Sequence, residues 1–236
     1  MANRRIDPLD GDGGLGLVDR VHAATREAIL TGVHPPGSRL LVSTLAAENG
    51  VSTIPVREAI RRLEAERLVA VELNRGATVT PISVDDLDDV YETRIVMECH
   101  ALRRAYPRLS EEVLRGARAD LERMTALLHA GRDRDAFVHH RAFHFALYEP
   151  AGSPWSMHLI AQLWSGAERY LRLSAGMRDS PEEFAAEHEE VLAAVAAGDV
   201  DAAVARLEEH FRRTQRLLDA AYGARDDEPE SQPSAA

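Results

Sequence analysis

The stretch LVSTLAAENGVSTIPVREAIRRLEAERLV, residues 41–69, decides what kind of fold this sequence can form. Gly50 is expected to end a short helix, and Ser52 can cap the next helix, over 53–67. Pro55 falls in the first turn of that second helix, where its missing N–H costs nothing. Two helices joined by such a tight turn are typical of a helix-turn-helix.

The second helix of this pair has two chemically different faces. Its apolar face holds Val56, Ile60 and Leu63. Its opposite face holds Ile54, Arg57 and Arg61. A buried stripe behind a basic outer face favours a helix that enters the major groove of DNA. The alternative is a small helical domain whose arginines are only solvated.

The flanking sequence completes a small domain around this motif. A helix is predicted over 17–31, and two strands over 68–73 and 77–82. The strands are separated by NRG, whose Asn and Gly suit a tight hairpin turn. Such a hairpin would form a wing with Gly76 at its tip, where a small residue lets the backbone approach a groove.

These linked motifs resemble a known DNA-binding domain. The segments ILTGVHPPGSRL and LAAENGVSTIPVREAIRRLEAERLVAVELNRGATV are similar to the winged helix-turn-helix of GntR-family regulators. The resemblance implies that double-stranded DNA is the partner. It places Ser52, Thr53 and Arg57 at the DNA, with Gly76 in the wing, and Arg61 lies on the same outer face as Arg57.

Two positions depart from the pattern of that family. Members often carry Arg where this chain has Thr53, and Arg or Glu near Ser43. Fewer guanidinium groups mean fewer bidentate contacts to guanine, so the operator sequence cannot be transferred from relatives.

The composition is that of a globular protein with an uneven charge distribution. Residues 1–80 carry equal numbers of Arg and acidic residues, although the whole chain has a net charge of −11. A net-acidic chain usually argues against nucleic acid, but the neutral N-terminal part leaves DNA open as a partner. The absence of a signal-peptide core and of a long apolar run, together with a single cysteine, predicts a cytoplasmic protein with no membrane partner.

The remainder of the chain predicts an all-α domain. Potential helix caps recur at Ser83, Ser110, Asp133, Ser153, Ser180 and Asp199. Each opens an amphipathic stretch, so about six helices with short connections should form an antiparallel bundle. The predicted fold is therefore mainly α, a winged helix-turn-helix over 15–82 and a bundle over 83–223. A disordered lead over 1–14 and a disordered tail over 224–236 would flank them.

The segment HHRAFH, residues 139–144, has three of the ten histidines of the chain. At 100° per residue, His140 and His144 fall in the apolar arc of their helix, and His139 falls about 100° away from His140. His188 and His210 lie within the apolar stripes of two later helices by the same test. Four inward imidazoles need polar partners and favour a shared divalent ion, with zinc or nickel the best match to neutral imidazole. A purely hydrogen-bonded polar pocket is the alternative.

The bundle also resembles a known domain. YETRIVMECHALRRA, HRAFHFAL and EHEEVLAAVAAGDVDAAVARLEEHF look like the FCD effector domain of the FadR subfamily. The resemblance implies a metal held by His140, His144, His188 and His210, and a homodimer that reads a pseudo-palindromic operator. It also implies that Arg94 binds the carboxylate of a small effector, a bidentate task suited to guanidinium.

One of these positions departs from the FCD pattern, because His140 stands where the family usually has Asp. The pair Asp135 and His139 would keep an Asp and a His one turn apart as metal ligands. By helical angle, however, His139 lies outside the apolar arc that faces the core.

Other classes of function are less consistent with the sequence. A zinc protease would need His-Glu-x-x-His, and a di-iron bundle would need Glu-x-x-His on two helices; neither occurs. We therefore expect a non-catalytic transcription regulator whose operator binding responds to a metal-bound carboxylate. A regulator with a purely structural metal is the alternative.

Overall fold

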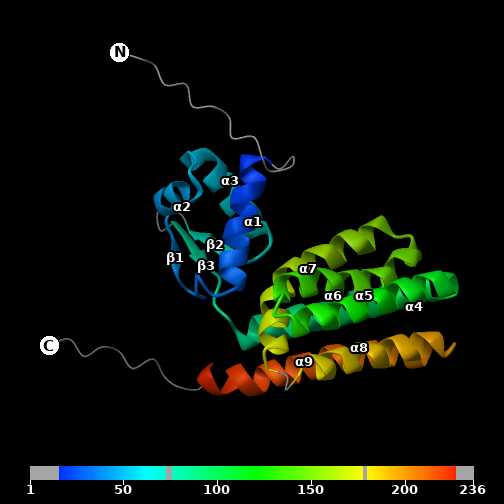
Figure 1. Cartoon of the computed structure of the whole chain (residues 1–236). Coiled ribbons are helices and arrows are strands. Elements are labelled where there is room, and N and C mark those ends of the chain that lie inside the picture. The colour runs from blue at the N-terminus through cyan, green and yellow to red at the C-terminus, as the bar shows by residue number, and fades with distance from the viewer. Residues whose placement is uncertain (1–15, 73–75, 178–179, 227–236) are drawn as a thin grey trace, which may run out of the picture. The chain divides into compact units, whose positions relative to one another are not determined.

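The computed structural model describes residues 16–72, 76–177 and 180–226, the last four by backbone alone (Figure 1). The chain divides into two compact units, Met1–Pro81 and Ile82–Ala236. The predicted lead over 1–14 lies outside the described residues, as do Asn74 and Arg75 of the predicted hairpin turn.

The N-terminal unit combines three helices with a small sheet. Its helices are α1 (Leu17–Leu30), α2 (Val42–Asn49) and α3 (Thr53–Ala65). Its strands are β1 (Arg39–Leu40), β2 (Val69–Glu72) and β3 (Gly76–Val79). They form one antiparallel sheet in the order β1-β3-β2. The sequence predicted β2 and β3 but not β1, because a two-residue strand exists only through its pairing with Ala77 and Thr78.

The helix-turn-helix is built as its sequence predicts. Val56 and Leu63 are fully buried and Ile60 nearly so, which confirms the apolar face of α3. Gly50 ends α2 in the left-handed region with φ 64°, where a side chain would be strained. Ser52 occupies the N-cap position of α3, but its side chain makes no capping hydrogen bond.

The C-terminal unit is a helical bundle. Its helices are α4 (Val84–Ala105), α5 (Glu111–His129), α6 (Asp133–Tyr148), α7 (Pro154–Ala175), α8 (Pro181–Ala196) and α9 (Val200–Asp226). Short 3-10 turns cover Tyr106–Arg108 and Glu149–Ala151. The long helices lie alongside one another, with α4 against α7 and α9, and α5 against α6 and α8 (Figure 1). The mainly α fold with a winged N-terminal unit is thereby confirmed.

Side-chain caps set most of the helix starts. Ser83, Ser110, Ser153 and Ser180 each accept a hydrogen bond from a backbone N–H of the first turn. Asp199 caps α9 through Oδ1. The predicted cap at Asp133 is wrong, since Arg132 is the N-cap residue and Asp133 is already helical. At the other end of the unit, α9 continues to Asp226, three residues into the predicted tail.

Helix α7 runs antiparallel to α4 and is fixed to it at both ends. Arg104 Nε donates to the carbonyl oxygen of Ala151, just before α7, at 3.1 Å. At the other end, Tyr170 donates to Asp86 Oδ2 at 2.7 Å, and Arg169 forms an ion pair with the same carboxylate. Within the described part of the chain, no helix combines the length and the apolar character that crossing a bilayer requires.

A polar contact between α1 and the end of α3 stabilises the N-terminal unit. Glu66 accepts from Arg26 Nε at 2.8 Å and lies 2.6 Å from His22 Nε2. Burial opposes the charge on Glu66, but His22 and Arg26 outweigh it and hold the pKa of this carboxyl below 4.5.

We expect Glu66→Gln to lower the free energy of unfolding of this unit by about 1–2 kcal/mol at neutral pH, because charged hydrogen bonds are lost. Since the folded pKa is depressed, the stabilisation is present above the ordinary Glu pKa and is lost as pH falls through the folded pKa. Native-state hydrogen exchange on α1 and α3 measures the effect. Glu64→Gln, on an exposed neighbour, is the control; an equal loss in both variants would contradict the assignment.

Candidate functional site

The outer face of α3 presents the residues predicted to meet DNA. Thr53, Arg57 and Arg61 are exposed on this helix, and Ser52 is exposed at its N-cap. Gly76 begins β3 with φ 89°, a backbone conformation that favours glycine. The structure thus places three of the five predicted residues on α3, Ser52 at its N-cap and Gly76 in the wing strand.

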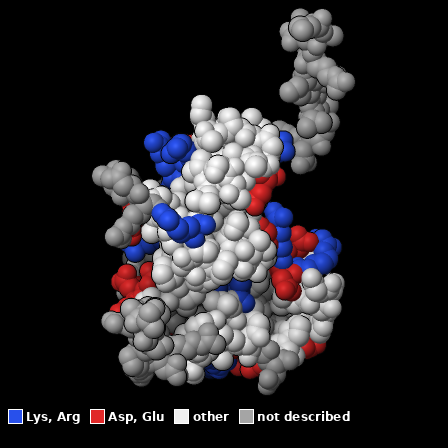
Figure 2. Space-filling view, turned by 90° about the vertical axis from the view of Figure 1, so that its left-hand side faces the viewer, with Lys and Arg blue, Asp and Glu red and all other residues white. Residues whose placement is uncertain are grey.

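A surface hollow of about 780 Å³ lies between the start of α1 and the outer face of α3. Arg57, Arg61 and the highly exposed Ile54 line it. On the face of the molecule drawn in Figure 2, basic side chains occur in separate small groups, some of them beside acidic side chains, and most of the remaining surface is uncharged.

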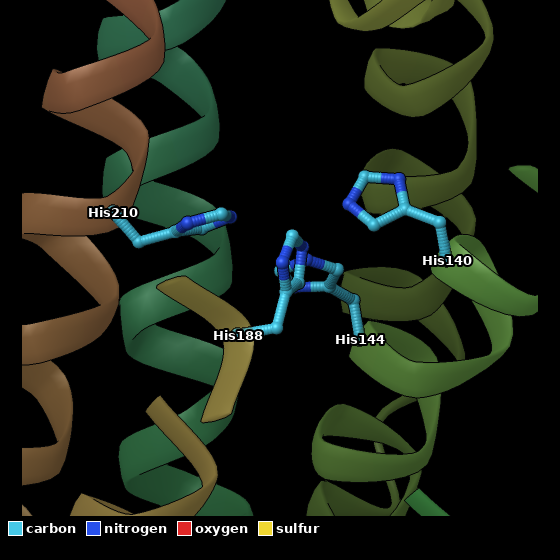
Figure 3. Close-up of side chains that lie close together, drawn as sticks. All are labelled: His140, His144, His188 and His210. Carbon is cyan, nitrogen blue, oxygen red and sulfur yellow. The ribbon is translucent and has the colours of Figure 1, made fainter. Parts of the chain in front are cut away.

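The C-terminal unit brings four histidines together. His140 and His144 come from α6, His188 from α8 and His210 from α9, and their rings point toward one another (Figure 3). One nitrogen of each lies within 4.8 Å of the others, and all four side chains are buried. The inward direction predicted from the helical angles is therefore what the structure has.

Hydrogen bonds orient two of the rings. His188 Nδ1 lies 2.7 Å from the carbonyl oxygen of Phe184 and must carry the proton, which leaves the lone pair on Nε2. His144 Nδ1 lies 3.2 Å from the hydroxyl oxygen of Tyr148, and His144 Nε2 has no hydrogen-bond partner within the described residues. Both rings therefore present Nε2 in the way that metal-binding imidazoles do.

The fourth ring has a carboxylate behind it. His210 Nδ1 lies 3.5 Å from Glu187 Oε2. Nitrogen ligands of one zinc ion, each at about 2.0–2.1 Å, lie about 3–4 Å apart, so small side-chain adjustments bring the group to bonding distance. The donor set, its spacing and the unpartnered nitrogen fit a divalent ion of the zinc or nickel type.

The electrostatics of the site keep the His144 imidazole neutral. Burial lowers the pKa of His144 well below 6.5, and the neighbouring histidines and Arg94 lower it further. Neutral imidazole is the metal-binding form. The aromatic rings of Trp164 and Phe184, each 5.2 Å from the His140 ring, form part of an apolar wall.

A buried ion pair lies beside the histidines. Arg94 Nε donates to Glu98 Oε1 at 2.7 Å, and both side chains are fully buried. Trp164 Nε1 donates to the other oxygen of Glu98 at 2.9 Å. The guanidinium carbon of Arg94 is 4.6 Å from the Trp164 ring and 4.7 Å from the Phe211 ring, two rings that also contact His144. Arg94 therefore points into the bundle and lies near the histidine group.

The terminal nitrogens of Arg94 are the notable feature of this pair. Nη1 and Nη2 are buried and have no hydrogen-bond partner within the described residues. Glu98 occupies the Nε side of the guanidinium, so the Nη1/Nη2 edge is left for another acceptor.

A small cavity of about 20 Å³ lies between α6 and α7, and two of its lining residues, Phe137 and Trp164, contact the ring of His140. Phe137, Trp164 and Leu171 line it, together with Arg141 and Glu168. This volume holds about one water molecule, so a larger ligand requires the two helices or their side chains to move.

The alternative metal pair has other partners. His139 Nδ1 lies 2.8 Å from Asp120 Oδ1, and its side chain is partly exposed. Arg132 Nε donates to Asp135 at 2.8 Å. Neither His139 nor Asp135 belongs to the group of four.

The only cysteine of the sequence is a poor nucleophile and a poor metal ligand. Burial, helped by the nearby carboxylates of Glu208 and Glu98, raises the pKa of the Cys99 thiol to about 12. At neutral pH it is a protonated thiol.

Several residues of the site were missed from the sequence. Glu98 and Tyr148 follow Arg94 and His144 by four residues, so the helical spacing could have indicated both. Trp164 and Glu187 give no such signal, because they reach the site from other helices.

The comparisons with known proteins agree with this arrangement. Residues 17–79 match the model of bacterial regulatory proteins of the gntR family, and residues 89–213 match the FCD domain. The chain is 35% identical over 185 residues to the uncharacterized HTH-type transcriptional regulator BphR of Paraburkholderia xenovorans, covering 75% of this chain and 74% of that protein.

Solved structures agree as well. The structure of McbR/YncC of E. coli is 25% identical with a TM-score of 0.72, over 89% of this chain and 100% of that one. A putative GntR regulator from Rhodococcus sp. RHA1 is 28% identical with a TM-score of 0.69, over 86% of this chain and 98% of that one. The chain is therefore a DNA-binding transcription regulator that belongs to the GntR family and carries a C-terminal FCD domain.

Proposed function

We propose that this regulator is of the FadR subfamily, is not an enzyme, and controls operator binding through a small carboxylate effector in its FCD domain. His140, His144, His188 and His210 hold a divalent ion, zinc or nickel, and Arg94 binds the effector carboxylate. The ion, when bound, supplies an open coordination position for an effector oxygen.

The observation that carries the proposal is the state of Arg94. A fully buried guanidinium with two unpartnered terminal nitrogens is costly unless an acceptor fills the site. A carboxylate matches the Nη1/Nη2 edge with two parallel hydrogen bonds. The histidine group lies near this guanidinium, because His144 shares its Trp164 and Phe211 contacts with Arg94.

Entry of an effector could be transmitted through α7 to the start of α4, which follows the connection between the two units. Trp164 lines the narrow cavity and contacts Glu98, so a ligand that enters must displace it or α7. On the same helix, Tyr170 and Arg169 bond to Asp86 in the first turn of α4, directly after the connection between the two units. A shift of α7 would therefore change the start of α4.

On the DNA side, Ser52, Thr53, Arg57, Arg61 and Gly76 are proposed to contact the operator. Arg57 and Arg61 are exposed on the outer face of α3, the helix that enters the major groove in this type of motif.

A homodimer is proposed to read a pseudo-palindromic operator. Val96 on α4 and Trp155 and Leu159 on α7 are exposed apolar side chains. The antiparallel register of the two packed helices, from Ala151 beside Arg104 to Tyr170 beside Asp86, puts Val96 and Leu159 at the same level. An apolar surface of this kind is suited to burial against a second copy.

A regulator whose metal is purely structural is the second candidate. It is favoured by the aromatic packing around the histidines, which leaves a cavity for only about one water. In that case the metal stabilises the bundle and no effector binds.

The DNA face is tested by Arg57→Ala. We expect a loss of about 1–3 kcal/mol in binding to the operator that the wild type selects from a random DNA library, because a base or phosphate contact is removed. Arg115→Ala, on an exposed position of α5, is the matched control. Two wild-type chains should bind each site. Unchanged affinity of Arg57→Ala would refute the assignment of α3 as the reading helix.

The metal site is tested by alanine variants of the histidines. Substitution at 140, 144, 188 or 210 should lower divalent metal affinity at least about 100-fold, more than the loss of an outer partner does. His139→Ala should keep wild-type metal content. Elemental analysis after dialysis, with circular dichroism to verify folding, gives the answer. Metal loss in His139→Ala but not in His144→Ala would show that the ligand set is misassigned.

The sensing function is tested by thermal shift with a panel of small carboxylates. A carboxylate that raises Tm in the metal-loaded protein should fail in chelated protein and in Arg94→Lys, but not in the control Arg123→Lys. The same compound should change operator affinity. If chelation lowers Tm while no carboxylate has any effect, the metal is structural.

A further inference from the structure

One apolar residue of the helix-turn-helix has no role in the core. Ile54 is the second residue of α3, and it is 77% exposed. Within the described part of the N-terminal unit, no large apolar residue is more exposed. At 100° per residue, Ile54 lies about 180° around the helix from Leu63, which is fully buried. The fold therefore leaves a branched apolar side chain in water.

The neighbours of Ile54 place it on the face proposed to meet DNA. Ile54 lines the same surface hollow as Arg57 and Arg61. By helical angle it lies about 60° from Arg57 and about 20° from Arg61. The N-terminal residues of a recognition helix are the ones that contact base edges in the major groove. A single exposed apolar residue is common on protein surfaces, so it is this position beside two exposed arginines that points to a base.

The chemistry of the side chain selects which base this would be. In the major groove, thymine presents a methyl group at C5, whereas the other three bases present only hydrogen-bonding groups. Isoleucine can neither donate nor accept a hydrogen bond, so an amino group of adenine or cytosine placed against it would lose its partner. The hydroxyl groups of Ser52 and Thr53 can bond to several bases and discriminate less.

We propose that Ile54 determines part of the operator specificity by packing against the C5 methyl of a thymine in each half-site. This inference rests on the proposed function, because it requires α3 to be the helix that reads the operator. Contact with the methyl removes apolar surface of both groups from water, which is favourable in proportion to the buried area. The chain would then read one base by apolar contact beside the polar contacts of Arg57.

The experiment removes the methyl group without changing base pairing. The full-length protein first selects its operator from a random DNA library, and each thymine of one half-site is then replaced in turn by deoxyuridine. Fluorescence anisotropy gives the dissociation constant for each duplex. For the wild type we expect one such replacement to weaken binding about fourfold, which corresponds to about 0.8 kcal/mol for one buried carbon group.

Variants at position 54 test whether this residue contacts the methyl. Ile54→Ala should bind the thymine operator more weakly than the wild type, and the same deoxyuridine replacement should then have almost no effect. Ile54→Val keeps a branched apolar side chain and should retain most of the sensitivity. Val33→Ala is the matched control, because Val33 is 71% exposed and follows the end of α1 opposite the hollow. It should behave as the wild type.

The outcomes separate this inference from the proposed function. A selected operator without a methyl-sensitive thymine overturns the inference, as does a deoxyuridine penalty that persists unchanged in Ile54→Ala. Either result leaves α3 as the reading helix, provided that Arg57→Ala weakens operator binding. Unchanged operator affinity of Arg57→Ala would instead overturn the proposed DNA face itself. Circular dichroism verifies that each variant is folded, and the measurement on the wild type decides the first outcome without any variant.

Discussion

The buried ion pair between Arg94 and Glu98 is the interaction on which the C-terminal site depends. Glu98 accepts hydrogen bonds from Arg94 on its own helix and from Trp164 on α7, so one carboxylate fixes the two helices at the level of the histidines. Breaking such a buried pair by removing one partner typically costs about 3–5 kcal/mol, because the other charge is left uncompensated. The same contact leaves the Nη1/Nη2 edge of Arg94 facing the interior.

Two buried polar side chains near this pair, His144 and Tyr148, are uncharged, and aromatic rings pack around them. Burial lowers the pKa of His144 and raises that of Tyr148, so both remain uncharged at neutral pH. When an ion binds at His144 Nε2, Nδ1 must carry the proton and donate to Tyr148. The hydrogen bonds behind the histidines thus prepare their free nitrogens for a metal ion.

The two units of the chain solve different electrostatic problems. The outer face of α3 keeps Arg57 and Arg61 in solvent, where their charges are hydrated and accessible to a polyanion. The bundle buries Arg94 and the histidines, where an uncompensated charge is unfavourable. This contrast fits a regulator that has its DNA contacts on one unit and the proposed sensing site in the interior of the other.

The sequence by itself determined the features that repeat along one helix. The period of 3.6 residues placed Val56 and Leu63 inside and Arg57 outside, and it separated His140 and His144 from His139. Gly50 and four serine caps were equally local, since each acts within a turn. Only the tertiary structure decided the relations between helices. It brought Trp164 to Glu98, Glu187 to His210 and the short strand β1 to β3. The physical reason is that helical periodicity depends on neighbouring residues, whereas the register of packed helices depends on side chains far apart in the chain.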